Sequence, residues 1–126
     1  MANNYLYDEQ IIVGKTVKSI VNNNNKELLL DFTDGSRGVF YHGQDCCESV
    51  YIQESDDLSL LEAATITAIT KEETDASEYS YDSSTLTTLL FVSKIGKVKV
   101  TWLGISNGYY SESVDFKFYP ADSNED

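Results

Sequence analysis

The sequence has little of several residue types, and each shortage excludes a class of protein. Lys and Arg number 9 against 21 Asp and Glu in 126 residues, for a net charge of −12. Nucleic-acid phosphates are bound chiefly by Lys and Arg, so we expect no direct nucleic-acid binding. No apolar run approaches the ~18 residues that cross a bilayer, and the N-terminus lacks the features of a signal peptide. We therefore expect a cytoplasmic protein without membrane association.

Cysteine and histidine are also scarce. The two cysteines, Cys46 and Cys47, are neighbours, and the only histidine is His42. A bridge between neighbours forces a strained ring, because disulfides usually span a Cα separation of ~5.5 Å. We therefore expect two separate thiols in a reducing compartment. One histidine and two adjacent cysteines cannot complete the four-ligand set of a structural zinc, so we expect neither metal nor cofactor.

Hydrophobic residues mostly alternate with polar ones, which is typical of strands with one solvent-exposed face. The clearest hairpin joins strands over 26–32 and 37–42 through Asp34-Gly35, a strong turn signal. If these two residues form the loop, Leu28 pairs with Tyr41. One face of the hairpin then carries Leu28, Leu30, Phe32, Val39 and Tyr41, and the other carries Leu29, Asp31, Phe40 and His42.

The whole chain is expected to be a single domain over 1–126, mainly β, with antiparallel sheets of about six to eight strands and at most one short helix. Further strands are expected at 16–21, 49–53, 65–70, 86–92, 97–102 and 113–118. The last three form a three-stranded meander, and a helical segment at 58–64 begins after Asp56 or Asp57 as N-cap. An acidic mobile loop at 71–84 and an acidic tail at 120–126 complete the chain. Barrel, sandwich and open sheet remain alternatives.

Acidic residues are concentrated between Asp45 and Asp82, where eleven carboxylates and one lysine leave a net of ten negative charges. The expected acidic surface consists of Glu72, Glu73, Asp75, Glu78 and Asp82. Lysines are concentrated on the C-terminal strands, so we expect an electrically polar molecule whose acidic side meets a basic protein. The alternative is a solvated surface that serves solubility only.

Two non-periodic segments hold the residues that could form a binding site. The first, from His42 to Glu48, combines the histidine, both cysteines and two carboxylates. The second surrounds the Asn107-Gly108 turn with aromatic side chains, which are common anchors of binding surfaces. Both segments follow strand ends, so we expect them to lie close together. The candidate binding residues are His42, Gln44, Asp45, Cys46, Cys47, Glu48, Trp102, Ser106, Asn107, Tyr109 and Tyr110.

Each segment also has a purely structural explanation as a turn packed against the core. The sequence contains no phosphate-binding loop, dinucleotide-binding motif, nucleophile elbow or zinc-protease motif. An enzyme is therefore not expected, and no residue is assigned a catalytic role.

The same two segments resemble a known family. His42-Gly-Gln-Asp-Cys-Cys-Glu-Ser-Val50 resembles the H-x-Q-D-C-C-E-x-V signature of a small family from tailed phages and prophages. Residues 100–116 are similar to that family's W-x-G-x-S-N-G-Y-Y-S-E segment, although Leu103 stands where an aromatic residue is frequent. The resemblance covers roughly residues 14–118. Because the family is uncharacterised, the resemblance implies a phage or prophage origin and no activity, cofactor or catalytic residue.

Two functions are compatible with these observations. The first is a phage-type acidic, non-catalytic binding protein that engages a basic host protein in the infected or lysogenic cell, for host takeover or anti-defence, for example as a DNA mimic. A homodimer is left open. The second is a small-molecule or small enzymatic pocket. The residues of that pocket would be His42, Asp45, Cys46, Trp102, Tyr109 and Tyr110. A cavity between the segments favours the pocket, and one continuous acidic face away from them favours the protein partner.

Overall fold

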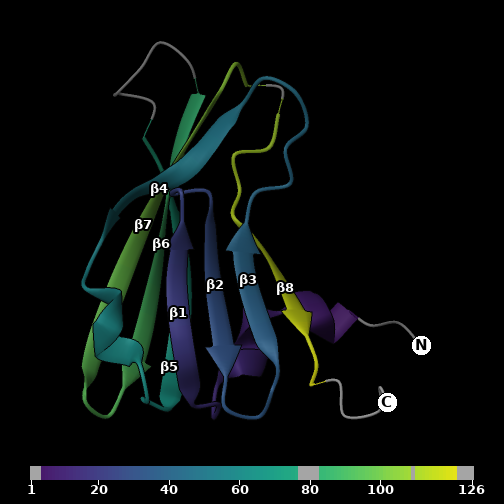
Figure 1. Ribbon diagram of the computed structural model, residues 1–126. Helices are drawn as coiled ribbons and strands as arrows, with labels where there is room; N and C mark the ends of the chain where they lie inside the picture. Colours follow the sequence, from purple (N-terminus) through teal and green to yellow (C-terminus); the bar gives the residue numbers. More distant parts are fainter. Residues whose placement is uncertain (1–3, 77–82, 109, 122–126) are drawn as a thin grey trace.

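The computed structural model describes residues 4–76, 83–108 and 110–121, which form eight strands and three short 3-10 turns (Figure 1). The elements are, in chain order, η1 (Asn4–Tyr7), η2 (Glu9–Ile12), β1 (Val17–Asn23), β2 (Glu27–Phe32), β3 (Arg37–Tyr41), β4 (Ser49–Ser55), η3 (Leu58–Leu61), β5 (Ile66–Asp75), β6 (Ser83–Ser93), β7 (Gly96–Ser106) and β8 (Asp115–Tyr119).

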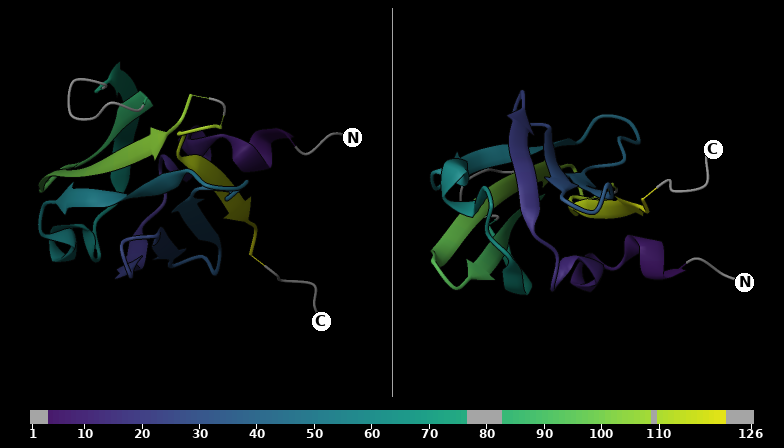
Figure 2. Two further views of the ribbon diagram at one scale, coloured as in Figure 1. Left: turned by 90° about the horizontal axis from the view of Figure 1, so that it is seen from above. Right: turned by 60° about the horizontal axis from the view of Figure 1, so that its bottom comes forward.

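The strands form two antiparallel sheets, with the orders β1-β2-β3-β8 and β4-β7-β6-β5. Figure 2 shows them as two layers. The ring of Phe40 in the first sheet contacts that of Phe91 in the second, with centroids 5.7 Å apart. One hydrophobic cluster joins both sheets. The expected mainly β, antiparallel fold is confirmed, and its architecture is the sandwich.

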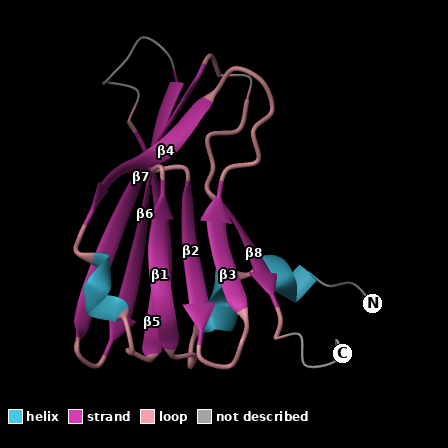
Figure 3. Ribbon diagram, in the orientation of Figure 1, coloured by secondary structure: helices cyan, strands magenta, loops and turns pink. Residues whose placement is uncertain are grey.

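The helical content is limited to the 3-10 turns (Figure 3). The segment expected at 58–64 is the single turn η3, and Asp57 caps it by accepting a hydrogen bond from the N–H of Ser59. Sequence reasoning missed η1 and η2, which precede the first strand. Within the described parts of the chain, no helix has the length and apolar character needed to cross a membrane.

The expected β2–β3 hairpin exists, but its register is shifted by one residue. Leu28 pairs with Phe40, not with Tyr41. The loop holds three residues instead of two and closes through Gly35, whose φ is 90°. Three-residue hairpin loops end in such a left-handed residue, and one extra loop residue turns the next strand over. Phe40 is therefore in the core, whereas Val39 and Tyr41 are half-buried on the other face.

The acidic segment 71–84 is not a single loop. β5 continues to Asp75, and β6 already begins at Ser83. The Thr and Leu residues of β6 favour a strand, and β6 supplies the backbone partner that holds the acidic residues of β5 in the sheet. Charged side chains suit an edge strand because they remain in solvent. Residues 77–82 and the tail 122–126 lie outside the described residues.

The C-terminal strands do not form the expected three-stranded meander. β6 and β7 pair as expected, but β8 crosses to the other sheet and pairs with β3. The reason is that β4 already occupies the second edge of β7, so β7 is a central strand without a free edge. In the other sheet, Phe116 of β8 lies opposite Phe40 and contacts its ring.

Candidate functional site

The two signature segments meet at one end of the sandwich. Ser49, which follows the first segment, pairs with Ile105 of the second. His42 Nδ1 lies 2.7 Å from the carbonyl oxygen of Ser113. The expectation that these segments lie close together is confirmed. We name this region, at the top of Figure 1, the loop end; it comprises the loops 42–48 and 107–114 and the adjoining ends of β5 and β6.

A buried carboxylate holds the loop 42–48 in shape. The Glu48 side chain is 0% exposed, and its Oε2 lies 2.6 Å from His42 Nε2. The backbone N–H of Asp45 donates to Oε2 (2.8 Å), and that of Cys46 donates to Oε1 (2.9 Å). These donors satisfy a charge that is otherwise costly to bury. The N–H of Cys46, followed by the His42 ring, lowers the pKa of Glu48 to about 2.

The His42 side chain joins the two loops and is 4% exposed. One ring nitrogen lies against the Glu48 carboxylate and the other against the Ser113 carbonyl, so the ring connects the loop 42–48 to the loop 107–114. Gln44 Nε2 strengthens the loop by donating to the backbone oxygen of Glu48 (2.7 Å). His42 and Glu48 are thus engaged in internal hydrogen bonds that hold the two loops in shape.

The low pKa of Glu48 predicts how stability depends on pH. The pKa of about 2 lies below the ordinary value of 4.5, so the ionised carboxylate stabilises the fold above the ordinary value, and this contribution is lost as the pH falls toward 2. Glu48→Gln removes the titrating group. We expect the difference in melting temperature between the native protein and E48Q to be largest near pH 7 and to shrink between pH 4.5 and 2. Circular dichroism measures it, and a difference that persists unchanged in acid would contradict the assignment.

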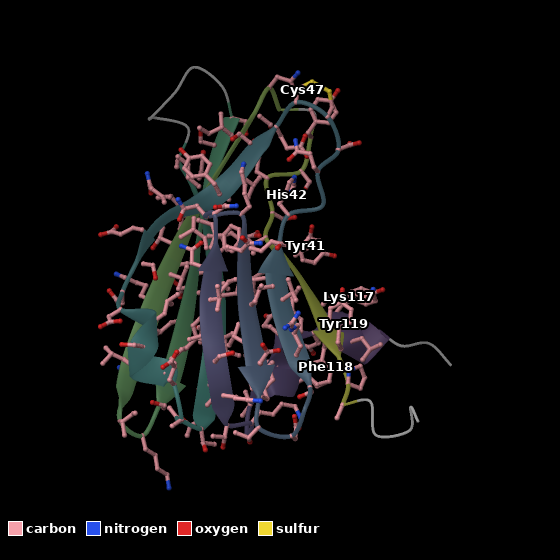
Figure 4. All side chains as sticks on the ribbon, in the orientation of Figure 1. Tyr41, His42, Cys47, Lys117, Phe118 and Tyr119 are labelled. Atoms are coloured by element: carbon pink, nitrogen blue, oxygen red, sulfur yellow. A yellow bond between two sulfur atoms is a disulfide. The ribbon has the colours of Figure 1, made fainter. Side chains whose placement is uncertain are left out.

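The two cysteines are not the separate thiols expected from the sequence. The sulfur atoms of Cys46 and Cys47 are bonded in a disulfide at the exposed tip of the loop (Figure 4). The N–H groups of Asp45 and Cys46 point inward to Glu48, and the bonded side chains of Cys46 and Cys47 are exposed on the outside of the loop. Among the described residues, no group of three or more His, Cys, Asp or Glu is placed to hold a metal ion.

A second carboxylate shapes the loop 107–114. Glu112 accepts hydrogen bonds from Ser106 Oγ (2.5 Å) and Thr85 Oγ1 (2.7 Å). Burial raises the pKa of Glu112, but these hydroxyl groups and that of Ser83 outweigh it, so the pKa lies below its ordinary value. Gly104 lets the loop lie directly on β7, since a Cβ there would be 2.6 Å from the Glu112 backbone oxygen. Sequence reasoning missed Glu112, although the family segment contains it.

The described residues of the alternative pocket are not brought together around one cavity. Trp102 is 1% exposed and lies in the core, because it follows Val98 and Val100 on the inward face of β7. Asp45 and Cys46 are exposed on the outer loop instead. The remaining candidates include exposed, half-buried and buried residues. Gln44, Cys47 and Asn107 are exposed, Tyr110 is half-buried, Ser106 is buried, and Tyr109 lies outside the described residues.

The acidic residues are exposed, as expected, but they do not form one continuous face. Of the described carboxylates between 45 and 82, only Glu48 is buried. Lys97 and Lys99 lie on β7, which separates β4 from β6 and β5 in the sheet order. The acidic groups of β4 and β5 are therefore on opposite sides of a lysine-bearing strand, and the expected single acidic side is wrong.

The loop end exposes carboxylates, and the opposite end carries charges of both signs. Asp45 and Glu73 are exposed at the loop end. The β6–β7 hairpin at the opposite end (Figure 1) holds Lys94 and Lys97, and the exposed Asp56 bonds to the backbone of Lys99 nearby. Of the expected acidic surface, Glu72, Glu73 and Asp75 are exposed, and Glu78 and Asp82 lie outside the described residues.

Fold and site together define a small antiparallel β-sandwich with a polar end made of two loops that internal carboxylate contacts hold in shape. The model of a family described as a domain of unknown function (DUF7448) matches residues 10–116, and the chain belongs to this family. No curated protein and no solved structure matches the chain.

Proposed function

We propose that the protein is a non-catalytic binding protein whose loop end engages a basic surface on a protein partner. The observation that carries this proposal is the exposure of carboxylates at the loop end, where Asp45 and Glu73 both face solvent. Exposed carboxylates attract a basic partner to this end of the molecule and speed their encounter.

Internal contacts hold both loops in shape before a partner binds, and this supports the same function. Glu48 binds backbone N–H groups of its own loop, and Glu112 ties the other loop to β6 and β7. A surface that is ordered before it binds loses less entropy on association. The groups best suited to acid–base chemistry, His42 and Glu48, are taken up by these internal contacts, which favours binding over catalysis.

The resemblance to the phage family supports a host protein as the partner, in the cytoplasm of an infected or lysogenic cell. Takeover of a host process or inhibition of a defence enzyme would be the consequence. An enzyme that binds DNA carries a basic surface for phosphate groups, and an acidic loop end can occupy that surface as a mimic.

Removal of two charges from the loop end should weaken partner binding. The variant is Asp45→Asn with Glu73→Gln, and the matched control is Glu54→Gln with Glu62→Gln, which removes two exposed carboxylates elsewhere. We expect pull-down from host lysate at low salt to lose the partner with the loop-end variant and to retain it with the control. Both variants should melt within about 2 °C of the native protein, because exposed charges contribute little to stability.

A second experiment compares retention of the partner at low and high salt concentration. The partner should elute from the native protein as ionic strength rises from roughly 0.05 M to 0.5 M, because added salt screens exposed charges. Equal retention by the two variants, or a complex insensitive to salt, would contradict an electrostatic role for the loop end.

A further inference from the structure

The outer edge of β5 is partly covered. β5 is the last strand of its sheet, so this edge has no neighbouring strand. The backbone of Ile66 bonds to Gly14 and Lys15, and Gln10 Nε2 donates to the carbonyl oxygen of Ile69 (2.9 Å). A register shift between Ile66 and Ala68 explains why Ile66 and Ile69 both point to the same edge. The segment around η2 therefore protects the first half of β5.

The second half of this edge is open. Alternate residues of an antiparallel strand direct their backbone groups to the same edge. Because Ile69 points outward, Lys71 and Glu73 do so as well, and no other described segment bonds to their outward backbone groups. Unpaired N–H and C=O groups on an edge are a template for one more strand.

The charges of β5 determine which strand can be added. Glu72, Glu73 and Asp75 are all exposed along this half of the strand. A second copy of the same edge would place like charges opposite one another, which destabilises pairing. An extended segment with a Lys or Arg opposite Glu73 and a neutral residue opposite Lys71 would avoid this repulsion and place opposite charges at Glu73.

A polar hollow lies beside the open edge at Glu73. It has a volume of about 280 Å³, and Glu73, Tyr110 and Glu112 contribute to its lining. Glu73 points to this side because it pairs with Thr87, a buried residue on the inward face of β6. Two carboxylates and an aromatic ring are suitable partners for an ammonium or guanidinium group.

A second hollow lies beside Lys71, with a volume of about 240 Å³. Tyr7, Tyr41 and Asp115 contribute to its lining, and Lys71 itself is held at one side, where Nζ donates to the carbonyl oxygen of Val114 (3.1 Å). The two hollows share Ser113. They therefore follow each other along the open edge and can receive successive side chains of an extended chain.

We infer that an extended segment of the partner, with a Lys or Arg opposite Glu73, adds to the open edge of β5 as a further strand. This inference rests on the proposed function and specifies how the basic partner docks. Backbone bonds to Lys71 and Glu73 supply affinity, and a basic side chain in the hollow at Glu73, followed by a neutral one in the hollow at Lys71, supplies specificity.

Proline at position 73 separates strand pairing from charge. Glu73→Gln removes the charge and keeps the N–H, whereas Glu73→Pro removes both. The lost N–H faces outward, so the bonds between β5 and β6 remain. The probe is a fluorescent Lys-Thr-Lys-Val-Thr-Thr-Thr peptide, whose third residue can lie opposite Glu73 while its fifth, a threonine, lies opposite Lys71 in antiparallel pairing, and binding is followed by anisotropy at low salt. We expect E73Q to weaken binding about threefold, and E73P to weaken it roughly tenfold more, as loss of a hydrogen bond does.

A modified peptide tests pairing without any change to the protein. Methylation of alternate backbone nitrogens keeps every charge but blocks strand addition, and binding should fall roughly tenfold. With the unmodified peptide, hydrogen exchange at the amides of Lys71 and Glu73 should slow. The melting temperature of E73P shows whether that variant folds, and the methylated peptide gives the result in either case.

Two outcomes would overturn the inference. In the first, E73P and E73Q bind the peptide equally and methylation has no effect, which leaves an electrostatic contact without strand addition. In the second, the native protein does not bind the peptide saturably although it captures its partner in a salt-sensitive way. The proposed function survives both outcomes. It fails separately, if the variant Asp45→Asn with Glu73→Gln captures the partner as well as its control does.

Discussion

Replacement of Glu48 by alanine is expected to lower the melting temperature by about 10 °C or more. The change leaves the N–H groups of Asp45 and Cys46 and the ring of His42 without their common acceptor. Buried donors that lose their acceptor destabilise a protein more than the original bonds stabilised it, because their desolvation is no longer compensated. Thermal unfolding followed by circular dichroism measures the change.

The control for this variant is Asp45→Asn in the same loop. Its exposed side chain can change while its N–H still donates to Glu48, so the melting temperature should stay within about 2 °C of the native value. If E48A melted as close to the native protein as D45N does, the carboxylate would not be what holds the loop.

Valine at position 104 is expected to destabilise the protein by about 3 kcal/mol. A Cβ at Gly104 would lie 2.6 Å from the backbone oxygen of Glu112 and 2.8 Å from its Cβ, so the loop 107–114 must move away from β7. That movement would also separate Glu112 from the hydroxyl of Ser106. Urea unfolding gives the loss in free energy, and hydrogen exchange should rise in the loop.

Gly43→Ala is the matched control. The Cβ added there lies 3.4 Å from Asp115 Oδ2, which is an ordinary contact, and the backbone N–H still donates to that carboxylate. We expect a change within about 0.5 kcal/mol. Similar losses in both variants would show that the effect at Gly104 does not come from its contact with Glu112.

The alternation of apolar residues was sufficient to predict the strands but not their register. Asp34-Gly35 fits a two-residue loop and also the end of a three-residue loop, and these choices bury opposite faces of β3. The structure has the longer loop, so Phe40 and not Tyr41 enters the core. The placement of β8 depends on which edges remain free after β4 has paired, and a local pattern does not contain that information.

For the candidate site, residue type was a poorer guide than periodicity. Alternation with Val98 and Val100 already indicated that Trp102 is a core residue, yet its aromatic character suggested a surface anchor. The role of Glu48 could not be predicted, because it acts on backbone N–H groups, which every residue except proline has. The nearness of the two segments was predictable because both follow strand ends.

The hydrogen bonds between Glu48 and the backbone fix the shape of the loop 42–48, so this shape does not depend on the exposed side chain of Asp45. Because the carboxylate holds N–H groups, the side chain of Asp45 is exposed and does not support the turn, whereas Cys46 and Cys47 are joined by their disulfide. Antibody loops show the same division between a constant framework and variable contact residues. A substitution at position 45 can therefore alter the chemistry that this loop exposes while the path of its backbone stays unchanged.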